Sequence, residues 1–159
     1  MQFEHKSNNR HKQLPWQSFK YHSSTNIDAK YWLGYYYYHE EVIELKPINR
    51  EERIKTAAGI FKETADKGNP SAQIRYGMCL WKGEGIEADP FEALKYFEMA
   101  AKLGNAAAMY ATGKAYWSGV NGIKQNKSLG AEYLKNAASK GHDKAKEICK
   151  EICISDNIL

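Results

Sequence analysis

The sequence predicts an all-α fold, an αα solenoid of stacked helical pairs, and two observations lead to it. Gly68, Gly104 and Gly141 each end an apolar, helix-favouring run, and they recur at intervals of 36 and 37 residues. Gly77 and Gly113 lie inside such runs and are also 36 residues apart. A period in the high thirties is typical of repeats that contain two helices each.

The second repeat unit, residues 71–106, shows the expected helical pair most clearly. Its helices are expected over 71–82 and 90–104, with a glycine-containing loop between them. Asn69 and Asp89 each precede a proline, and an acceptor side chain followed by proline is a typical helix start. The glycine that follows the second helix suits the left-handed conformation that closes many helices.

The first and third units follow the same plan. In the first, residues 28–70, the second helix is expected to begin after Asn49. In the third, residues 107–142, Asn126 is expected to cap the second helix. The repeat domain as a whole is expected to cover residues 28–155.

The two ends of the chain lack the complete pattern. Residues 143–155 are expected to form a C-terminal capping helix, because Ala145 lies in register with the first helices of the preceding units. Residues 1–27 are rich in His, Lys, Asn and Ser, and we expect an N-terminal arm there, partly disordered or with one short helix.

Small residues predict where the two helices of a unit cross closely. Gly77 and Gly113 fall inside first helices, where glycine costs about 1 kcal/mol relative to alanine. Its recurrence in register therefore implies a packing benefit. We expect the second helices to meet these glycines with Ala100–Ala101 and Ala137–Ala138, and rings such as Phe97 to fill the space beside them.

The repeated pattern is specific enough to indicate a family. From Ala72 to Asn105 the second unit reads A-x3-Y-G-x2-L-x2-G-x-G-I, a short loop with Asp, then A-L-x-Y-F-x2-A-A-x2-G-N. The third unit departs at Thr112, where leucine is usual, and at Gly130, where alanine is usual, and the first lacks both loop glycines. Across residues 28–155 the chain resembles the Sel-1-like repeat family, a relative of the tetratricopeptide repeat (TPR) with a longer loop.

This resemblance implies a right-handed superhelix of about three helical hairpins plus a capping helix. It also implies a non-catalytic adaptor or scaffold that binds a protein or peptide partner. Members of the family act in signalling, in endoplasmic-reticulum quality control, as activators of fungal chitin synthase and beside kinase domains. An alternative is therefore a regulatory subunit or tail of a signalling assembly, kinase-associated or similar to a chitin synthase activator.

A further alternative is a small-molecule-binding hydrolase. One branch of the family is associated with β-lactam binding and hydrolysis, and its members are secreted and carry a disulfide in each repeat. The cysteines of this chain, at positions 79, 149 and 153, do not pair unit by unit, which argues against that activity. The sequence shows no catalytic triad, metal-ligand set or nucleotide loop, so we expect no enzyme activity, catalytic residue, cofactor or metal.

Composition and charge also limit the classes of partner. The net charge of +4 comes from basic residues interspersed with acidic ones, so we expect no nucleic-acid partner. No apolar run is long enough to span a membrane, and no signal peptide can be recognised, so we expect no membrane insertion and a cytoplasmic location. The sequence does not determine the oligomeric state; a monomer is the expectation.

Helical geometry predicts a binding face. At 100° per residue, each first helix turns one side to the core and leaves large residues on the opposite side. In related helical repeats this opposite side lines the concave surface, and aromatic residues there are typical of binding sites. Packing of neighbouring first helices against these rings is the alternative interpretation. The predicted partner-binding residues are Tyr31, Trp32, Tyr35, Tyr38, Ile74, Arg75, Met78, Trp81, Tyr110, Lys114 and Trp117.

Overall fold

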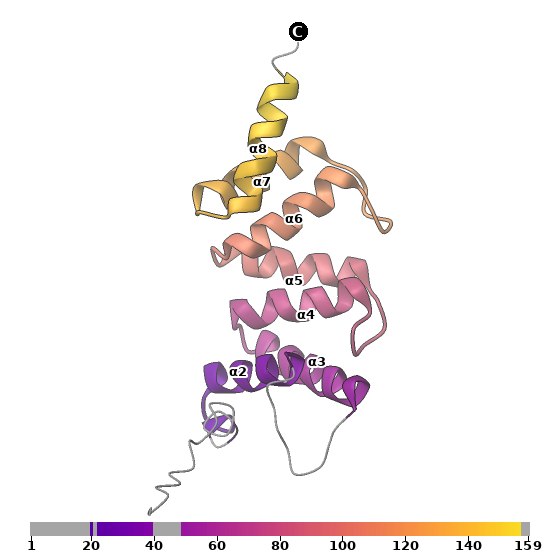
Figure 1. Ribbon diagram of the computed structural model, residues 1–159, viewed down its shortest axis with the longest axis vertical. Coiled ribbons are helices and arrows are strands. Elements are labelled where there is room, and N and C mark those ends of the chain that lie inside the picture. The colour runs from indigo at the N-terminus through magenta and orange to yellow at the C-terminus, as the bar shows by residue number, and fades with distance from the viewer. Residues whose placement is uncertain (1–19, 21, 40–48, 157–159) are drawn as a thin grey trace, which may run out of the picture.

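The computed structural model describes residues 20, 22–39 and 49–156, so residues 1–19 and 21 of the expected N-terminal arm lie outside the described residues. The helices stack along the long axis of the molecule, with α2 towards one end and α8 at the other (Figure 1). Their bounds are α2 Ile27–Tyr38, α3 Arg50–Asp66, α4 Pro70–Lys82, α5 Pro90–Lys102, α6 Ala106–Ser118, α7 Lys127–Ser139 and α8 Asp143–Asp156.

The main packing contacts join helices that are consecutive in the chain, from α2 against α3 through to α7 against α8. Three hairpins result, α2–α3, α4–α5 and α6–α7, and α8 covers the last of them. The all-α solenoid predicted from the glycine spacing is therefore confirmed. The first helices α2, α4 and α6 do not pack on one another as extensively as they pack on their neighbours in sequence.

Side-chain caps start α3, α4, α5 and α7 as the sequence predicts, and α2 and α6 have caps that were not predicted. Asn69 and Asp89 accept hydrogen bonds from the backbone N–H of Ala72 and Glu92, over 2.8 and 2.9 Å. Asn49 and Asn126 cap α3 and α7 in the same way, and Asn26 and Asn105 cap α2 and α6. The glycines that close α3, α5 and α7 adopt left-handed φ values of 89°, 88° and 92°.

The helices α4 and α5 approach each other closely because Gly77 has no side chain to separate α4 from the aromatic ring that it faces. A Cβ atom on Gly77 would lie 2.6 Å from Cε1 of Phe97 and 3.2 Å from the carbonyl oxygen of Ala93. The expectation that Ala100–Ala101 meet this glycine is therefore wrong. Those two alanines pack instead with Ala108 at the junction with α6, in a separate buried cluster.

The α6–α7 crossing brings two glycines together. A Cβ atom on Gly130 would lie 2.6 Å from the backbone nitrogen of Trp117 and 2.9 Å from the carbonyl oxygen of Gly113. One on Gly113 would lie 2.9 Å from Cγ of Leu134. The two backbones thus approach each other directly, which explains why glycine stands at 130 where the family usually has alanine.

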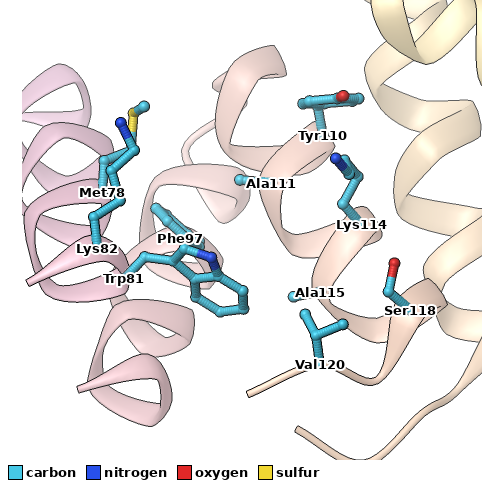
Figure 2. Close-up of a pocket in the computed structure, with 10 residues that line it drawn as sticks. All are labelled: Met78, Trp81, Lys82, Phe97, Tyr110, Ala111, Lys114, Ala115, Ser118 and Val120. Atoms are coloured by element: carbon cyan, nitrogen blue, oxygen red, sulfur yellow. The ribbon is translucent and has the colours of Figure 1, made fainter. Parts of the chain in front are cut away.

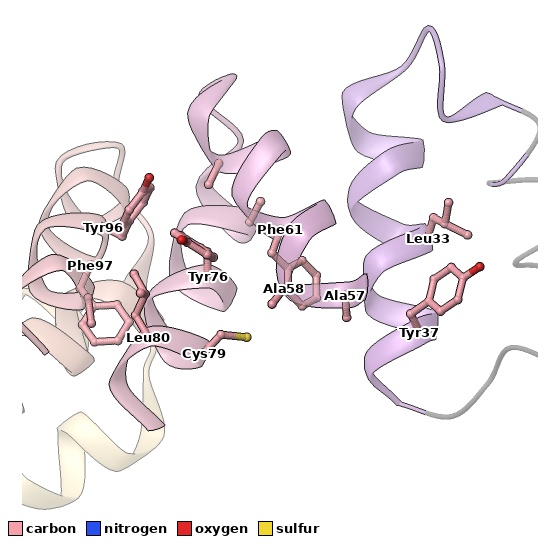
Figure 3. Packing of buried hydrophobic residues seen from close by; sticks show 13 residues of the cluster. Leu33, Tyr37, Ala57, Ala58, Phe61, Tyr76, Cys79, Leu80, Tyr96 and Phe97 are labelled. Atoms are coloured by element: carbon pink, nitrogen blue, oxygen red, sulfur yellow. The ribbon is translucent and has the colours of Figure 1, made fainter. Parts of the chain in front are cut away.

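The largest buried cluster extends across the first two hairpins (Figure 3). Phe61 on α3 is fully buried, and it lies between Leu33 and Tyr37 of α2 and Tyr76 and Leu80 of α4. Burying such side chains contributes roughly 1.5–3 kcal/mol each, so neither hairpin is expected to be stable without the other.

The C-terminus of α2 is closed without glycine. Arg53 on α3 is buried, and its Nη1 donates to the carbonyl oxygens of Tyr37 and Tyr38 over 2.6 and 3.0 Å. In the other units, Gly83 and Gly119 occupy left-handed conformations after α4 and α6. A guanidinium group from the partner helix thus satisfies carbonyl groups at the helix end that has lost its glycine.

Tyrosine–carboxylate hydrogen bonds connect neighbouring units. The hydroxyl of Tyr96 on α5 donates to Asp66 on α3 over 2.8 Å, and that of Tyr116 on α6 donates to Glu98 on α5 over 2.6 Å. Tyr38 on α2 donates to Glu84, in the loop after α4. Each junction between units therefore has at least one directional contact in addition to apolar packing.

Candidate partner-binding groove

Two cavities lie on the face formed by the first helices, between α4 and α6. One has a volume of about 390 Å³, and the other, of about 580 Å³, extends to the start of α8. They share Met78, Tyr110 and Ala111, so they adjoin. We call the two cavities together the groove.

The smaller cavity has an apolar floor (Figure 2). The Trp81 ring extends from α4 and packs near Phe97 of α5, with ring centroids 6.1 Å apart. Ala115 of α6 also packs in the cluster that Trp81 borders, and Val120, 44% exposed, lies in the loop that follows α6. Trp81 is thus half-buried, with its inner side in the core and part of its surface available to a ligand.

The larger cavity ends against the capping helix. The His142 ring stacks on Tyr110 of α6, with centroids 4.3 Å apart and an interplanar angle of 19°. Nδ1 of His142 accepts a hydrogen bond from the backbone N–H of Ala145 over 3.3 Å, in the first turn of α8. One side chain therefore both caps α8 and fixes this end of the groove, which Ile74 lines from α4.

Five of the predicted partner-binding residues line the groove, namely Ile74, Met78, Trp81, Tyr110 and Lys114. They belong to α4 and α6, and each is half-buried or exposed. Whether they bind a partner stays a prediction, but the structure brings them to one concave surface.

The four predicted residues on α2 form a separate aromatic cluster. Tyr31 and Tyr38 rest on Phe61, with ring centroids 6.0 and 6.2 Å away. Trp32, 42% exposed, contacts Tyr31 and Tyr35 edge-on, at 5.3 Å in both pairs. Two of these rings therefore support the core, and none lines the groove.

The two remaining predicted residues lie outside both cavities. The guanidinium of Arg75 lies 5.2 Å from the ring centroid of Tyr35, so it bridges α4 to the cluster on α2. Nζ of Lys127 lies 5.7 Å from the Trp117 ring. Equivalent helix positions thus have different surroundings in successive units.

Several groove residues were not predicted from the sequence. Phe97 was assigned to the space beside the α4–α5 crossing, yet it also contributes to the cavity floor. Val120 belongs to a loop, and a helical wheel gives no information about loops. His142 directly precedes the capping helix and Lys144 lies in its first turn, and the repeat register that aligned Ala145 with the first helices could have placed them beside Tyr110.

Two ionisable groups on the first helices have raised pKa values, which disfavour their reactive anionic forms. Cys79 lies on the buried side of α4, and this burial raises the pKa of its thiol to about 11, so the reactive thiolate is scarce at neutral pH. Burial, together with its hydrogen bond to Glu84, raises the pKa of Tyr38 to about 12. Among the described residues, no group of three or more His, Cys, Asp or Glu could hold a metal ion. Within the same residues, no helix has the length and apolar character to cross a membrane.

Comparison with known proteins identifies the repeats. The Sel1 repeat profile matches residues 27–51, 70–105 and 106–142. Chitin synthase regulatory factor 3 of Schizosaccharomyces pombe is 32% identical over 83 residues, covering 52% of this chain and 9% of that protein. The ERAD-associated E3 ubiquitin-protein ligase component HRD3A of Arabidopsis thaliana is 29% identical over 148 residues, covering 86% of this chain and 21% of that protein. The chain thus spans only a small part of the curated relatives that it matches.

Solved structures agree with this result. A Sel1 repeat protein from Oxalobacter formigenes superposes with a TM-score of 0.69 at 27% identity, covering 84% of this chain and 96% of that one. A protective antigen of uropathogenic Escherichia coli gives a TM-score of 0.73 at 17% identity, covering 86% of this chain and 28% of that one, and shows the shared fold alone. With three matched repeats and this architecture, the chain belongs to the Sel1 repeat family.

Proposed function

We propose that the protein is a non-catalytic adaptor that binds a peptide segment of a partner protein in the groove. The observation that carries this proposal is the groove itself, an apolar concavity on the face of the first helices. Exposed apolar surface of this kind is typical of interaction sites. Sel1 repeat proteins are generally interaction adaptors, and the relatives named above are a regulatory factor and a ligase component.

Regulation of a larger assembly is the second candidate. It is favoured by the 32% identity to a chitin synthase regulatory factor, and it requires the same groove to hold the regulated protein. We further propose a cytoplasmic, monomeric protein, consistent with the free thiol of Cys79. A role in signalling belongs to this second candidate.

Met78→Glu tests the adaptor function. Met78 is 36% exposed and lines both cavities, so a charge there should disrupt groove binding with little effect on the core. Met99→Glu is the matched control, because Met99 is 44% exposed on α5 and lines neither cavity.

The measurement is affinity capture from cells of the source organism, followed by titration of each captured protein in purified form. We expect Met78→Glu to weaken partner binding at least about tenfold, while Met99→Glu binds like the unmodified chain. Both variants should keep the helical content and melting temperature. Partners that bind both variants equally well would contradict the groove as the binding site.

A further inference from the structure

The two helices that form the groove carry charge of only one sign. α4 and α6 contain Arg75, Lys82 and Lys114, and neither contains an aspartate or glutamate. The second helices α3, α5 and α7 each contain both acidic and basic residues. The modest net charge of the chain thus hides an uneven distribution, in which the charged residues of the two groove-forming helices are all basic.

Two of the groove lysines are available to a ligand. Lys114, at the smaller cavity, is exposed, with its Nζ 5.8 Å from the Tyr110 ring centroid. Lys144, at the larger cavity, is exposed in the first turn of α8. Within the described residues neither lysine forms an ion pair. Lys82 is less available, because its Nζ lies 3.8 Å from Glu84.

Carboxylates near the groove are already engaged. Asp143 lines the larger cavity and accepts a hydrogen bond from Nζ of Lys146 over 3.1 Å. Glu84 accepts a hydrogen bond from the hydroxyl of Tyr38. Available positive charge at the groove therefore exceeds available negative charge, and a ligand carrying carboxylates would be electrostatically complementary to it.

The apolar floor adds a second requirement. A cavity of about 390 Å³ beside Trp81, Phe97 and Val120 lies within the usual size range of ligand pockets, roughly 300–1,000 Å³. Filling it with an apolar side chain removes both the cavity surface and that side chain from water. A purely anionic ligand would leave this floor unoccupied.

We propose that the groove binds an acidic peptide segment in which a large apolar side chain, seated against Trp81 and Phe97, is flanked by carboxylates that face Lys114 and Lys144. This inference rests on the proposed function and specifies the chemistry of the partner. The apolar side chain supplies most of the affinity, and the carboxylates fix the position and orientation of the segment.

Selection from a library of randomised short peptides, displayed against the full chain at physiological salt, tests this proposal. We expect sequences in which Phe, Trp, Leu or Met is flanked by Asp and Glu. The double variant Lys114→Glu, Lys144→Glu should weaken the selected peptide at least about tenfold and should itself select peptides rich in Lys and Arg.

The matched control is Lys102→Glu, Lys135→Glu. Both residues are exposed, on α5 and α7, and neither lines a cavity, so this variant changes the net charge equally but leaves the groove unchanged. It should bind the selected peptide within about twofold of the unmodified chain, since charges outside the contact are largely screened. Circular dichroism should show the same helical content in all three proteins.

The other outcomes separate the inference from the proposed function. Selected peptides that are lost with Met78→Glu but show no acidic preference would overturn the inference and leave the adaptor function standing. Selection of no peptide, or only of peptides that bind Met78→Glu equally well, would overturn both. A single-stranded oligonucleotide that binds as tightly as the peptide, with the same loss on groove charge reversal, would also overturn the peptide assignment.

Discussion

The second and third units follow one repeat pattern but pack differently. In α4–α5, Gly77 makes room for the Phe97 ring, which in turn supports Trp81. In α6–α7, Gly113 faces the backbone of Gly130, so no aromatic ring is interposed at that crossing. The pattern thus determines where two helices cross, whereas the residues at the crossing determine how close they come.

The tyrosine contacts differ between the two units as well. Tyr96 of the second unit donates to Asp66 of the first. Its counterpart Tyr133, 37 residues later, has no such partner available, because Lys102 stands 36 residues after Asp66. The corresponding junction is bridged instead by Tyr116 and Glu98, from different helix positions. A directional contact at a junction is retained although the residues that make it change.

The largest expected effect concerns the two equivalent tryptophans. Trp81→Ala should lower the free energy of unfolding by about 3 kcal/mol, because its ring packs against Phe97 and Ala115 in the core. Trp117→Ala should lower it by only about 1 kcal/mol, since that ring lies outside the buried clusters. Urea denaturation followed by circular dichroism measures both, and equal losses would mean that the units pack alike.

A smaller effect is expected where the two crossings differ. Gly130→Ala restores the usual residue of the family, yet it should destabilise the protein by about 2 kcal/mol, because the new Cβ meets backbone atoms that cannot rotate away. Ala93→Gly, at the equivalent position in α5, should cost about 1 kcal/mol through helix propensity, and the loss of its fully buried methyl group adds to that cost. Thermal unfolding of the two variants measures the difference, and a stabilising Gly130→Ala would contradict the close approach of α6 and α7.

The smallest effect concerns the junction between these units and appears only at high pH. The hydrogen bond to Glu98, with burial, raises the pKa of Tyr116 to about 12 from its usual value of 10.0. Its contribution to stability is therefore complete below pH 10 and is lost as the pH rises through about 12. Between neutral pH and about pH 11, Tyr116→Phe should lose less stability than the unmodified chain.

Other tyrosines also titrate in this range, so the comparison must be made between variants. Burial and the Asp66 hydrogen bond raise the pKa of Tyr96, which makes Tyr96→Phe the matched variant at the preceding junction. A pH dependence that neither variant changes would show that these hydrogen bonds do not contribute to stability.

Much of the fold was predictable because its signals are local. The caps at Asn69, Asp89 and Asn126, and the left-handed glycines that close the second helices, depend on a few neighbouring residues. The period of the glycines then gave the register of the helical pairs. Local signals of this kind can be recognised in a single sequence, so the predicted helix bounds agree with those of the structure within one or two residues.

The groove was predictable only in part because it depends on contacts between units. A helical wheel gives the direction of Met78 or Tyr110 but not what lies opposite. It could not show that Trp117 lies outside the cavities, or that Arg53 replaces the missing glycine at the end of α2. These outcomes depend on which side chain the next helix supplies.

The consecutive order of helix contacts has a consequence for how the chain folds. Each helix packs mainly on its neighbours in sequence, so the contacting residues are close together along the chain. Forming these contacts therefore costs little loop-closure entropy, and topologies of this kind fold rapidly. Folding can begin at any hairpin and spread in both directions, as in a one-dimensional Ising chain. Hydrogen exchange should then be slowest around Phe61 and Leu80 and fastest at the outer turns of α2 and α8, so that stability decreases from the centre of the stack towards its ends.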